Sequence, residues 1–419
     1  MDFGFIMKAV IMAAGEGTRL KPLTNTRPKV MLPVAGKPII YHLLREAKKA
    51  GIKEAIIIVR HMKEKIIEYL AVEEKTLWLR IIFIEQQEGY GTASAILAAE
   101  KYVNDTFVVL AGDTVTEASV IKSVIKAHDG SITLAVKEVE NPHNYGAVEL
   151  SGGIVRSFEE KPKHPKSNLV NLSVYCMEPA VFNEIRAIPK SERGEYEIVN
   201  LFIGKKAVKV DGFWMDIAYP WHLLDANDYL LSKMKAKRGS IENSKIKGKV
   251  IMERGASIIN SVIEGNVYIG ENSVIGPNAY IRGSTSIGKG CSVGGASTVK
   301  NSILFDRVNA KHLSYIGDSI IGEEVNFGAA TQIANYRFDS SSINVLTEKG
   351  WVNSGRNKFG TVVGDNTKFG VLSCTMPGKL IGENCWISSG VTVNKNVPPN
   401  TRVYVKQELH FAAAEEGGE

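Results

Sequence analysis

The residues best placed to do chemistry stand near the start of the chain, in a glycine-rich stretch that follows a short apolar run. Gly15 and Gly17 let the backbone approach a ligand closely and turn its N–H groups toward it. Arg19 and Lys29 bring a fixed guanidinium and a mobile ammonium to the same stretch. It is neither a dinucleotide fingerprint nor a P-loop, because the third glycine of the first and the Gly-Lys-Ser/Thr of the second are missing. The stretch therefore predicts a triphosphate site, although Gly-x-Gly alone would indicate only a surface turn.

Two carboxylates further along the chain are candidate ligands of a metal ion. Asp113 follows the apolar run FVVLAG, and Asp216 lies in GFWMDIAYP. Thr116 is expected to cap the helix after Asp113, and Pro220 to take the first position of the helix after Asp216. Neither carboxylate is then needed as a cap. Hard oxygen ligands beside triphosphate oxygens suit Mg²⁺, while a structural salt bridge is the alternative for each aspartate.

These groups need strands that end at one edge of a sheet, and the chain supplies a matching pattern. Short apolar runs alternate with helical stretches, which predicts an α/β domain. Ligands of such sheets bind at the carboxyl ends of the strands, where the glycine stretch and Asp113 fall. The predicted strands are residues 9–14, 55–59, 80–84, 107–111, 132–136 and 169–177, and a helix is expected over 221–235.

After Arg238 the sequence changes to a six-residue repeat, in which an aliphatic residue is usually followed by glycine and a small residue stands four places on. Such a repeat is typical of a parallel β-helix with three hexads in each coil. The aliphatic positions are Ile263, Ile269, Ile275, Ile281, Ile287, Val293 and Val299, then Ile321, Phe327, Ile333, Val363, Phe369, Ile381, Ile387 and Val393, with Thr375 as a weak member. The predicted organisation is an N-terminal domain (1–230), a linker (231–245), a β-helix (246–406) and a tail (407–419).

Two positions break the repeat by placing a charge where glycine is expected. Arg282 and Lys300 are three hexads apart, so they should stack on adjacent coils about 4.8 Å from each other. Two cations at that distance repel, which predicts an anion between them. Glu264, one coil earlier, is the alternative partner of Arg282, and that pairing would leave Lys300 unexplained.

Composition fits a globular enzyme with two domains. The chain has 419 residues, of which 44% are hydrophobic and 23% charged, and its net charge of +6 is spread along the sequence. The densest basic run, residues 233–238, indicates a linker, so neither a nucleic-acid nor a membrane partner is expected, and a cytoplasmic location is predicted. The cysteines have no metal-ligand spacing and are expected to be core thiols: Cys176, Cys291, Cys374 and Cys385.

The stretch AAGEGTRLKPLT, followed by RPKVMLPVAGKPI, resembles the signature of the sugar-1-phosphate nucleotidylyltransferases. The resemblance implies a Rossmann-like domain in which Arg19 and Lys29 neutralise charge at the reacting phosphorus while Asp113 and Asp216 bind Mg²⁺. The segment 193–202 also resembles the family, but a helix start explains it. The implied nucleotide contacts are Ala14, Gly15, Gly17, Thr18, Gln86 (or Gln87), Gly91 and Thr92, and the implied sugar-phosphate contacts are Gly146, Glu160, Lys161 and Asn171.

The segments HLSYIGD, EEVNFGAAT and NKF resemble the acetyltransferase half of the bifunctional N-acetylglucosamine-1-phosphate uridylyltransferases, and the hexads resemble the left-handed β-helix of hexapeptide acyltransferases. The resemblance implies that His312 is the general base, since an ammonium cannot attack until it loses a proton. The Ala329 N–H would meet the thioester oxygen, with Ser389 also at the acetyl-CoA site. Residues 337–356 intervene before Lys358, as in the archaeal branch. The implied amino-sugar-phosphate contacts are Arg282, Lys300, Tyr315, Asn326, Asn335 and Lys358.

Together the two resemblances imply synthesis of UDP-N-acetylglucosamine. Acetyl-CoA would acetylate glucosamine-1-phosphate, and UTP would then react with N-acetylglucosamine-1-phosphate and release pyrophosphate. A homotrimer is expected through the β-helix. One alternative is a glucose- or mannose-1-phosphate nucleotidylyltransferase using UTP, dTTP or GTP, with a purely structural β-helix. Another is an inactive regulatory subunit, against which the intact cationic and acidic groups count. The sequence leaves open uracil against thymine and gluco against galacto sugars.

Overall fold

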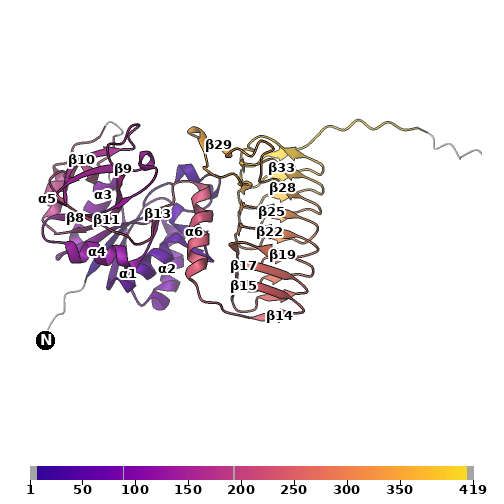
Figure 1. Cartoon of the computed structure of the whole chain (residues 1–419), viewed down its shortest axis with the longest axis horizontal. Helices are drawn as coiled ribbons and strands as arrows, with labels where there is room; N and C mark the ends of the chain where they lie inside the picture. The colour runs from indigo at the N-terminus through magenta and orange to yellow at the C-terminus, as the bar shows by residue number, and fades with distance from the viewer. Residues whose placement is uncertain (1–6, 88, 192–193, 413–419) are drawn as a thin grey trace, which may run out of the picture. The chain divides into compact units, whose positions relative to one another are not determined.

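The computed structural model describes residues 7–87, 89–191 and 194–412. The chain divides into two compact units (Figure 1). The first runs to Leu230, and the second begins at Leu231 and also takes in Lys21–Leu23. Within the described ranges, no helix combines the length and the apolar character needed to cross a bilayer.

The first unit is built on a nine-stranded mixed sheet with the order β5-β4-β1-β6-β11-β8-β12-β10-β9. Strand β1 is parallel to β4 and β6, and β11 is antiparallel to β6 and β8. The inner strands are aliphatic because they are buried on both faces. The strands are β1 (Lys8–Met12), β4 (Glu54–Val59), β5 (Arg80–Glu85), β6 (Phe107–Ala111), β8 (Ile132–Glu138), β9 (Gly146–Ser151), β10 (Ile154–Glu160), β11 (Leu169–Met177) and β12 (Lys206–Lys209).

Helices cover both faces of this sheet and form two hydrophobic cores. Ala9 and Ile11 of β1 lie in the core with α1, α2 and α4, whereas Val10 lies in the core with α3 and α5. This alternation follows from the two-residue period of a strand. The helices are α1 (Ile39–Lys49), α2 (Lys63–Leu77), α3 (Thr92–Leu97), α4 (Ala118–Ala127), α5 (Val181–Arg186) and α6 (Pro220–Lys233), with 3₁₀ turns η1 (Thr18–Leu20), η2 (Leu23–Asn25), η3 (Lys29–Met31), η4 (Glu100–Tyr102), η5 (Pro142–Asn144) and η6 (Ile198–Leu201).

Short antiparallel pairs shape the loops. Strand β2 (Pro33–Val34) pairs with β3 (Lys37–Pro38), and β7 (Thr114–Thr116) pairs with β13 (Trp214–Asp216). Pro220 starts α6, as the sequence predicts. The cap predicted at Thr116 is wrong, because Thr116 belongs to β7 and its hydroxyl donates to the Phe213 carbonyl, while Glu117 stands at the N-cap of α4.

The second unit is a stack of short parallel strands wound in coils (Figure 1). One column contains β14 (Ser240–Glu242), β16 (Ser257–Ile259), β18 (Val274–Ile275), β21 (Ser292–Val293), β24 (Asn309–Ala310), β27 (Asn326–Phe327), β32 (Lys368–Phe369), β35 (Trp386–Ile387) and β37 (Arg402–Val403). A thirteen-stranded sheet supplies the other columns, which β17 joins by pairing with β19 along its first half and β20 along its second. Its members are β15 (Lys245–Met252), β17 (Val262–Ile269), β19 (Tyr280–Arg282), β20 (Thr285–Ile287), β22 (Thr298–Lys300), β23 (Ile303–Leu304), β25 (Tyr315–Gly317), β26 (Ile320–Ile321), β28 (Gln332–Ile333), β31 (Thr361–Val363), β33 (Cys374–Thr375), β34 (Lys379–Ile381) and β36 (Thr392–Val393).

The predicted aliphatic positions line one continuous interior core. The interior column also continues between Val299 and Ile321, where the sequence shows no regular hexads, through Leu304, Ala310 and Ile316. The coil there loses a corner residue, so strands pair 17 residues apart, as in the register of β22 with β25. Thr375 is buried at an interior position and bonds to the Thr361 hydroxyl at 2.7 Å.

The cysteine prediction is confirmed for Cys176, Cys291 and Cys385, which are buried free thiols. Burial raises the pKa of Cys176 and of Cys291 to about 12, so both are inert at neutral pH. Cys374 is free but only partly buried, because it points outward from β33 beside Thr392.

Residues 337–356 form a packed extension rather than an irregular loop. Strands β29 (Asn344–Thr347) and β30 (Gly350–Asn353) make an antiparallel hairpin. Its base is anchored by Ile343 and Val345, which are buried, while Trp351 stays 66% exposed.

Candidate active sites

A cavity of about 780 Å³ in the first domain gathers most of the residues that the sequence singles out there. It lies past the carboxyl ends of β1 and β6, where an α/β sheet is expected to bind its ligand. Arg19 is the exception, since the lining drawn from the described residues does not include it. Predicted residues that line the cavity are Ala14, Gly15, Gly17, Thr18, Lys29, Gln86, Gly91, Thr92, Asp113, Gly146, Glu160, Lys161, Asn171 and Asp216.

The glycine loop is held tightly against Lys29. Gly17 has a φ of +69°, and a Cβ at this position would lie 2.8 Å from the Lys29 Cβ. The Gly17 carbonyl accepts hydrogen bonds from the Thr24 hydroxyl and from the Leu20 N–H, both at 2.9 Å. Any other residue here would be strained and would displace the lysine.

Lys29 lies between the two candidate metal ligands. Its ammonium is 2.5 Å from Asp113 Oδ2 and 3.8 Å from Asp216 Oδ1. The pairing of β7 with β13 brings the two aspartates together, and the Ile217 N–H donates to the Asp113 carbonyl at 3.1 Å. The sequence therefore predicts correctly that strand-end carboxylates converge beside the phosphate loop.

The electrostatics of this cluster suit a bound cation. Burial by itself lowers the pKa of Lys29, but the negative charges of Asp113 and Asp216 raise it by more. The pKa of Lys29 is therefore raised overall. Burial, together with Asp113, raises the pKa of Asp216, and Lys29 opposes that shift. Across the described part of the chain no three His, Cys, Asp or Glu side chains gather at metal-binding distance. Two carboxylates would thus fit Mg²⁺ only if triphosphate oxygens supplied most of its other ligands.

The far side of the cavity is closed by a segment that the sequence analysis set aside. Gly91 has a φ of +107°, and a Cβ there would lie 2.3 Å from the Tyr196 carbonyl oxygen, which accepts a hydrogen bond from the Ala93 N–H at 2.9 Å. Glu195 and Glu197 line the cavity. The predicted helix start is present, because η6 begins at Ile198 with Glu197 at its N-cap, but it does not explain why Glu195 and Glu197 line the cavity. Arg193 lies outside the described residues. The family resemblance was the available signal.

Gln86 is the better placed of the two candidate glutamines. It is 5% exposed, lines the cavity and donates to the Ser94 hydroxyl at 3.1 Å. Gln87 is exposed and is not among the described residues around the cavity.

At the predicted sugar end, Gly146 leaves room that a side chain would fill, because its Cβ would lie 2.3 Å from the Phe158 ring. Asn171 Nδ2 donates to the Tyr175 hydroxyl at 2.8 Å, and the Lys161 ammonium is 3.2 Å from Glu160. The lining also includes residues that sequence reasoning missed. These are Tyr145 and Trp214, whose rings meet edge to face at 5.6 Å, and Arg60, Tyr90 and Tyr175.

In the coiled domain, the predicted stacking of Arg282 and Lys300 is confirmed by the register of β19 with β22. The alternative pairing of Glu264 with Arg282 is not what the structure shows. Glu264 accepts from the Lys247 ammonium at 2.7 Å and from the Tyr280 hydroxyl. Arg282 lies over the Tyr280 ring at 5.5 Å, and its buried Nε has no hydrogen-bond partner among the described residues.

Lys300 has an anionic partner that the sequence analysis missed. Its ammonium is 3.2 Å from Asp318 Oδ2, and this carboxylate is 3% exposed. Asp318 comes from the next coil, 18 residues beyond Lys300, which is the three-hexad spacing that also separates Arg282 from Lys300. Extending that column by one coil would have found it. Arg282 is consequently better suited than Lys300 to offer uncompensated positive charge to an anion.

The other predicted residues of this domain lie in neighbouring coils. Asn335 Nδ2 donates to the Tyr315 hydroxyl at 3.2 Å. Tyr336 forms an antiparallel bridge with Lys358, whose ammonium stands 5.7 Å from the Tyr336 ring, so the chain leaves and re-enters the coil at one place. Of the remaining predicted residues, Ala329 is half-buried. The exposed ones are His312, Asn326 and Ser389.

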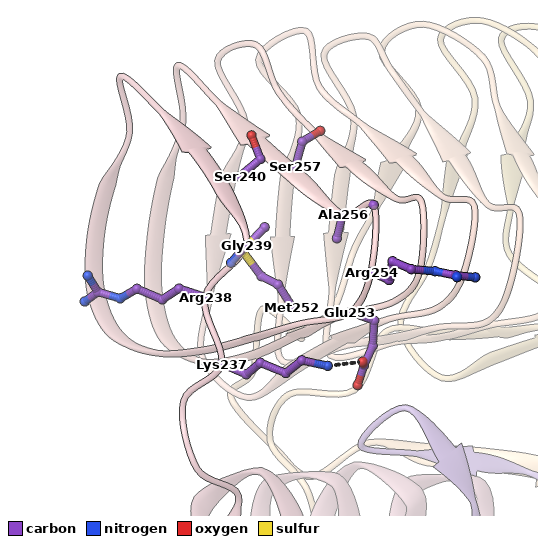
Figure 2. Close-up of a pocket in the computed structure, with 10 residues that line it drawn as sticks. Lys237, Arg238, Gly239, Ser240, Met252, Glu253, Arg254, Ala256 and Ser257 are labelled. Atoms are coloured by element: carbon purple, nitrogen blue, oxygen red, sulfur yellow. Dashed lines mark hydrogen bonds and ion pairs between the residues drawn. The ribbon is translucent and has the colours of Figure 1, made fainter.

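A second cavity, of about 500 Å³, opens among the first coils (Figure 2). Lys237 and Glu253 point toward each other and are 2.5 Å apart, and Arg254 pairs with Glu271 at 2.6 Å. Two of its cations are thus already compensated, and the predicted site residues are not among the described residues that line it. We assign it no ligand.

Comparisons with known proteins agree with this division. Residues 8–233 match the family model described as nucleotidyl transferase, and residues 263–410 match that of the GMPPB C-terminal domain. The bifunctional protein GlmU of Methanocaldococcus jannaschii is 41% identical over 97% of this chain and 99% of its own length. The bifunctional sugar-1-phosphate nucleotidylyltransferase/acetyltransferase of Sulfurisphaera tokodaii is 38% identical over 93% and 98%. The glucose-1-phosphate thymidylyltransferase of Streptomyces griseus is 32% identical over 63% and 78%.

A phosphate loop and paired carboxylates at the strand ends of an α/β domain define the first half of the chain as a nucleotidylyltransferase. Relatives that match almost the whole chain carry an acetyltransferase as well. The chain belongs to the bifunctional GlmU family of sugar-1-phosphate nucleotidylyltransferase/acetyltransferases.

Proposed function

We propose that this enzyme makes UDP-N-acetylglucosamine in two steps. The coiled domain transfers an acetyl group from acetyl-CoA to glucosamine-1-phosphate, and the α/β domain then transfers a uridylyl group from UTP to N-acetylglucosamine-1-phosphate. The observation that carries the proposal is the cluster of Lys29, Asp113 and Asp216 beside the phosphate loop. Full-length relatives named as bifunctional support the pairing of the two activities.

In the uridylyl step, a phosphate oxygen of the sugar phosphate attacks the α-phosphorus of UTP in line, and pyrophosphate leaves. Lys29 and Arg19 offset the negative charge that builds up on the phosphate oxygens. Mg²⁺ held by Asp113 and Asp216 would supply further charge neutralisation. Gln86 holds the base, and Glu160, Lys161 and Asn171 hold the sugar phosphate. Their place along one cavity supports these roles.

In the acetyl step, His312 accepts a proton from the sugar ammonium, so that the amine can attack the thioester carbonyl and release the thiol of CoA. The Ala329 N–H stabilises the developing oxyanion, and Ser389 contacts the donor. Arg282 and Lys300 hold the phosphate group, and the other contacts with the amino-sugar phosphate come from Tyr315, Asn326, Asn335 and Lys358. The buried, unpartnered Nε of Arg282 among the described residues supports an anion beside it.

The remaining features of the proposal concern assembly and location. The coils form a left-handed β-helix over residues 246–406, which the hexad repeat and the asparagine-rich corners with positive φ support. Residues 1–230 form the uridylyltransferase domain. The enzyme acts as a homotrimer in the cytoplasm.

Two assays test the proposal. Pyrophosphate release is measured over a panel of UTP, dTTP and GTP with glucose-, mannose- and N-acetylglucosamine-1-phosphate. We expect UTP with N-acetylglucosamine-1-phosphate to be turned over fastest. Thiol release from acetyl-CoA is measured with glucosamine- and galactosamine-1-phosphate. An enzyme that releases no thiol with either amino sugar contradicts the acetyltransferase half, and one that prefers dTTP with glucose-1-phosphate contradicts the other half.

A further inference from the structure

We propose that Asp318 is a positioning residue of the acetyl-transfer site, which fixes the Lys300 ammonium in the orientation that binds the amino-sugar phosphate. The inference rests on the proposed acetyltransferase function. It adds to that function a residue that does not itself touch the substrate, since its side chain is 3% exposed.

Asp318 occupies a corner that the preceding coil fills with Asn301 and the coil before that with Gly283. Asn301 and Asp318 stand at the same point of successive coils, as their N–H groups donate to the carbonyls of Arg282 and Lys300. Both have positive φ, 44° and 49°, which Asn and Asp tolerate better than other non-glycine residues. Corner geometry alone therefore accounts for an asparagine at 318 as well as for an aspartate. The negative charge needs another explanation.

The hydrogen bonds and the ion pair of the Asp318 carboxylate explain why this corner carries a negative charge. Oδ2 accepts from the Lys300 ammonium at 3.2 Å and from Asn335 Nδ2 at 2.5 Å, while Oδ1 accepts from Asn301 Nδ2 at 3.3 Å. A buried carboxylate is costly unless it is paired and hydrogen-bonded, and here both conditions are met. Two of its three partners are residues to which the proposed function gives a role in substrate binding.

The same contacts decide which end of the Asn335 amide is available. Its Nδ2 donates both to Asp318 and to the Tyr315 hydroxyl, so its two N–H bonds are used. Asn335 Oδ1 is then the atom left to meet the substrate, and an acceptor suits a hydroxyl or ammonium group rather than phosphate. Gly317 preserves this arrangement, because a Cβ there would lie 2.6 Å from Asn335 Nδ2 and 2.6 Å from the Tyr315 hydroxyl.

The first test replaces Asp318 with its neutral isostere. Asp318→Asn leaves the Lys300 charge without its partner, while the carbonyl oxygen of the new amide can still accept from Asn335 Nδ2. We expect KM for glucosamine-1-phosphate in thiol release to rise about tenfold, with kcat changed less than about threefold. The matched control is Asp365→Asn, a buried aspartate of the same domain that accepts from the Glu323 N–H at 2.8 Å. It should lower the melting temperature and leave KM unchanged.

The second test asks whether Asp318 acts through Lys300. In a cycle of Asp318→Asn, Lys300→Ala and the double variant, the double variant should bind glucosamine-1-phosphate within about twofold of Lys300→Ala alone. Binding is measured by calorimetry, independently of turnover. Multiplicative effects of the two substitutions, or an unchanged KM in Asp318→Asn, would overturn the inference.

Two further outcomes keep the tests decisive. The Asp318→Asn substitution can be tested even if it fails to fold alone, because the double variant removes both charges. We then expect the double variant to fold and to bind glucosamine-1-phosphate as Lys300→Ala does. A double variant that folds but binds more weakly than Lys300→Ala refutes the proposal. A parent enzyme that binds glucosamine-1-phosphate but releases no thiol refutes the acetyltransferase function and leaves the role of Asp318 in binding to stand on the calorimetric cycle.

Discussion

Replacing Asp113 by Asn should raise the Mg²⁺ requirement of pyrophosphate release without touching acetyl transfer. A charge-assisted hydrogen bond contributes about 1.5–3 kcal/mol, and the lower value is appropriate because Asp113 is 30% exposed and its charge is partly screened. Mg²⁺ carries two charges where Lys29 carries one, so losing one of two carboxylates should cost about 3 kcal/mol of metal affinity. This corresponds to an increase of about a hundredfold in the half-saturating Mg²⁺ concentration.

The assay is initial-rate pyrophosphate release with saturating UTP and N-acetylglucosamine-1-phosphate over a Mg²⁺ series. Asp211→Asn is the matched control, since Asp211 is an exposed aspartate of the same segment and is not among the described residues that line the cavity. Its Mg²⁺ dependence should equal that of the parent. An Asp113→Asn enzyme with the parent's half-saturating concentration would refute the assignment of Asp113 as a ligand.

The same variant carries a pH prediction. Burial and then Asp113 raise the pKa of Asp216, and Lys29 opposes them. The burial persists in Asp113→Asn, but the neighbouring negative charge is gone, so the pKa of Asp216 should fall. Since Asp216 must be ionised to bind a metal, the acidic limb of the pH profile should move to lower pH, measured at the variant's own saturating Mg²⁺. A shift to higher pH would contradict the proposed coupling.

Three further substitutions test other parts of the molecule. His312→Ala should lower acetyl transfer at least about a hundredfold with little change in KM, and a variant as fast as the parent would exclude His312 as the base. Gly91→Ala should weaken UTP binding and lower the melting temperature, because the new Cβ would meet the Tyr196 carbonyl at 2.3 Å and φ is +107°; unchanged calorimetric and thermal values would argue against that clash. Arg282→Lys keeps the charge but loses the planar fork, so a several-fold rise in KM for glucosamine-1-phosphate indicates a bidentate contact and an unchanged KM indicates a purely coulombic one.

The parts of the fold that the sequence predicts well are those whose signal is local. The strand 107–111 coincides with β6, because an unbroken apolar run is itself what a doubly buried strand requires. The strand 169–177 coincides with β11, in which the apolar residues outnumber Asn171 and Ser173. Asp113 and Asp216 are recognisable because each directly follows or ends such a run.

What sequence reasoning missed depends on partners that are distant along the chain. Asp318 pairs with Lys300 on the preceding coil. Glu195 and Glu197 reach the cavity because the segment that contains them is hydrogen-bonded to the residues around Gly91. The gap between Val299 and Ile321 in the predicted aliphatic positions has a different cause. A corner that loses one residue disrupts a six-residue period in the sequence, yet the strands on either side remain paired in space.

The hairpin that begins after Tyr336 shows that residues can be inserted between two coils without changing the geometry of the site that the coils form. The strands before and after it pair as if it were absent, since Ile320 pairs with Val362 and Asn326 with Lys368 at the same offset of 42 residues. The position of each coil along the axis is set by the pairing of its strands with those of the neighbouring coils. The number of residues inserted at a corner does not change that position. Asn335 and Lys358 therefore stay neighbours when the exposed part of the hairpin changes. Apart from its buried anchors Ile343 and Val345, its sequence is free to diversify, shorten or carry a grafted epitope while the site beneath it is preserved.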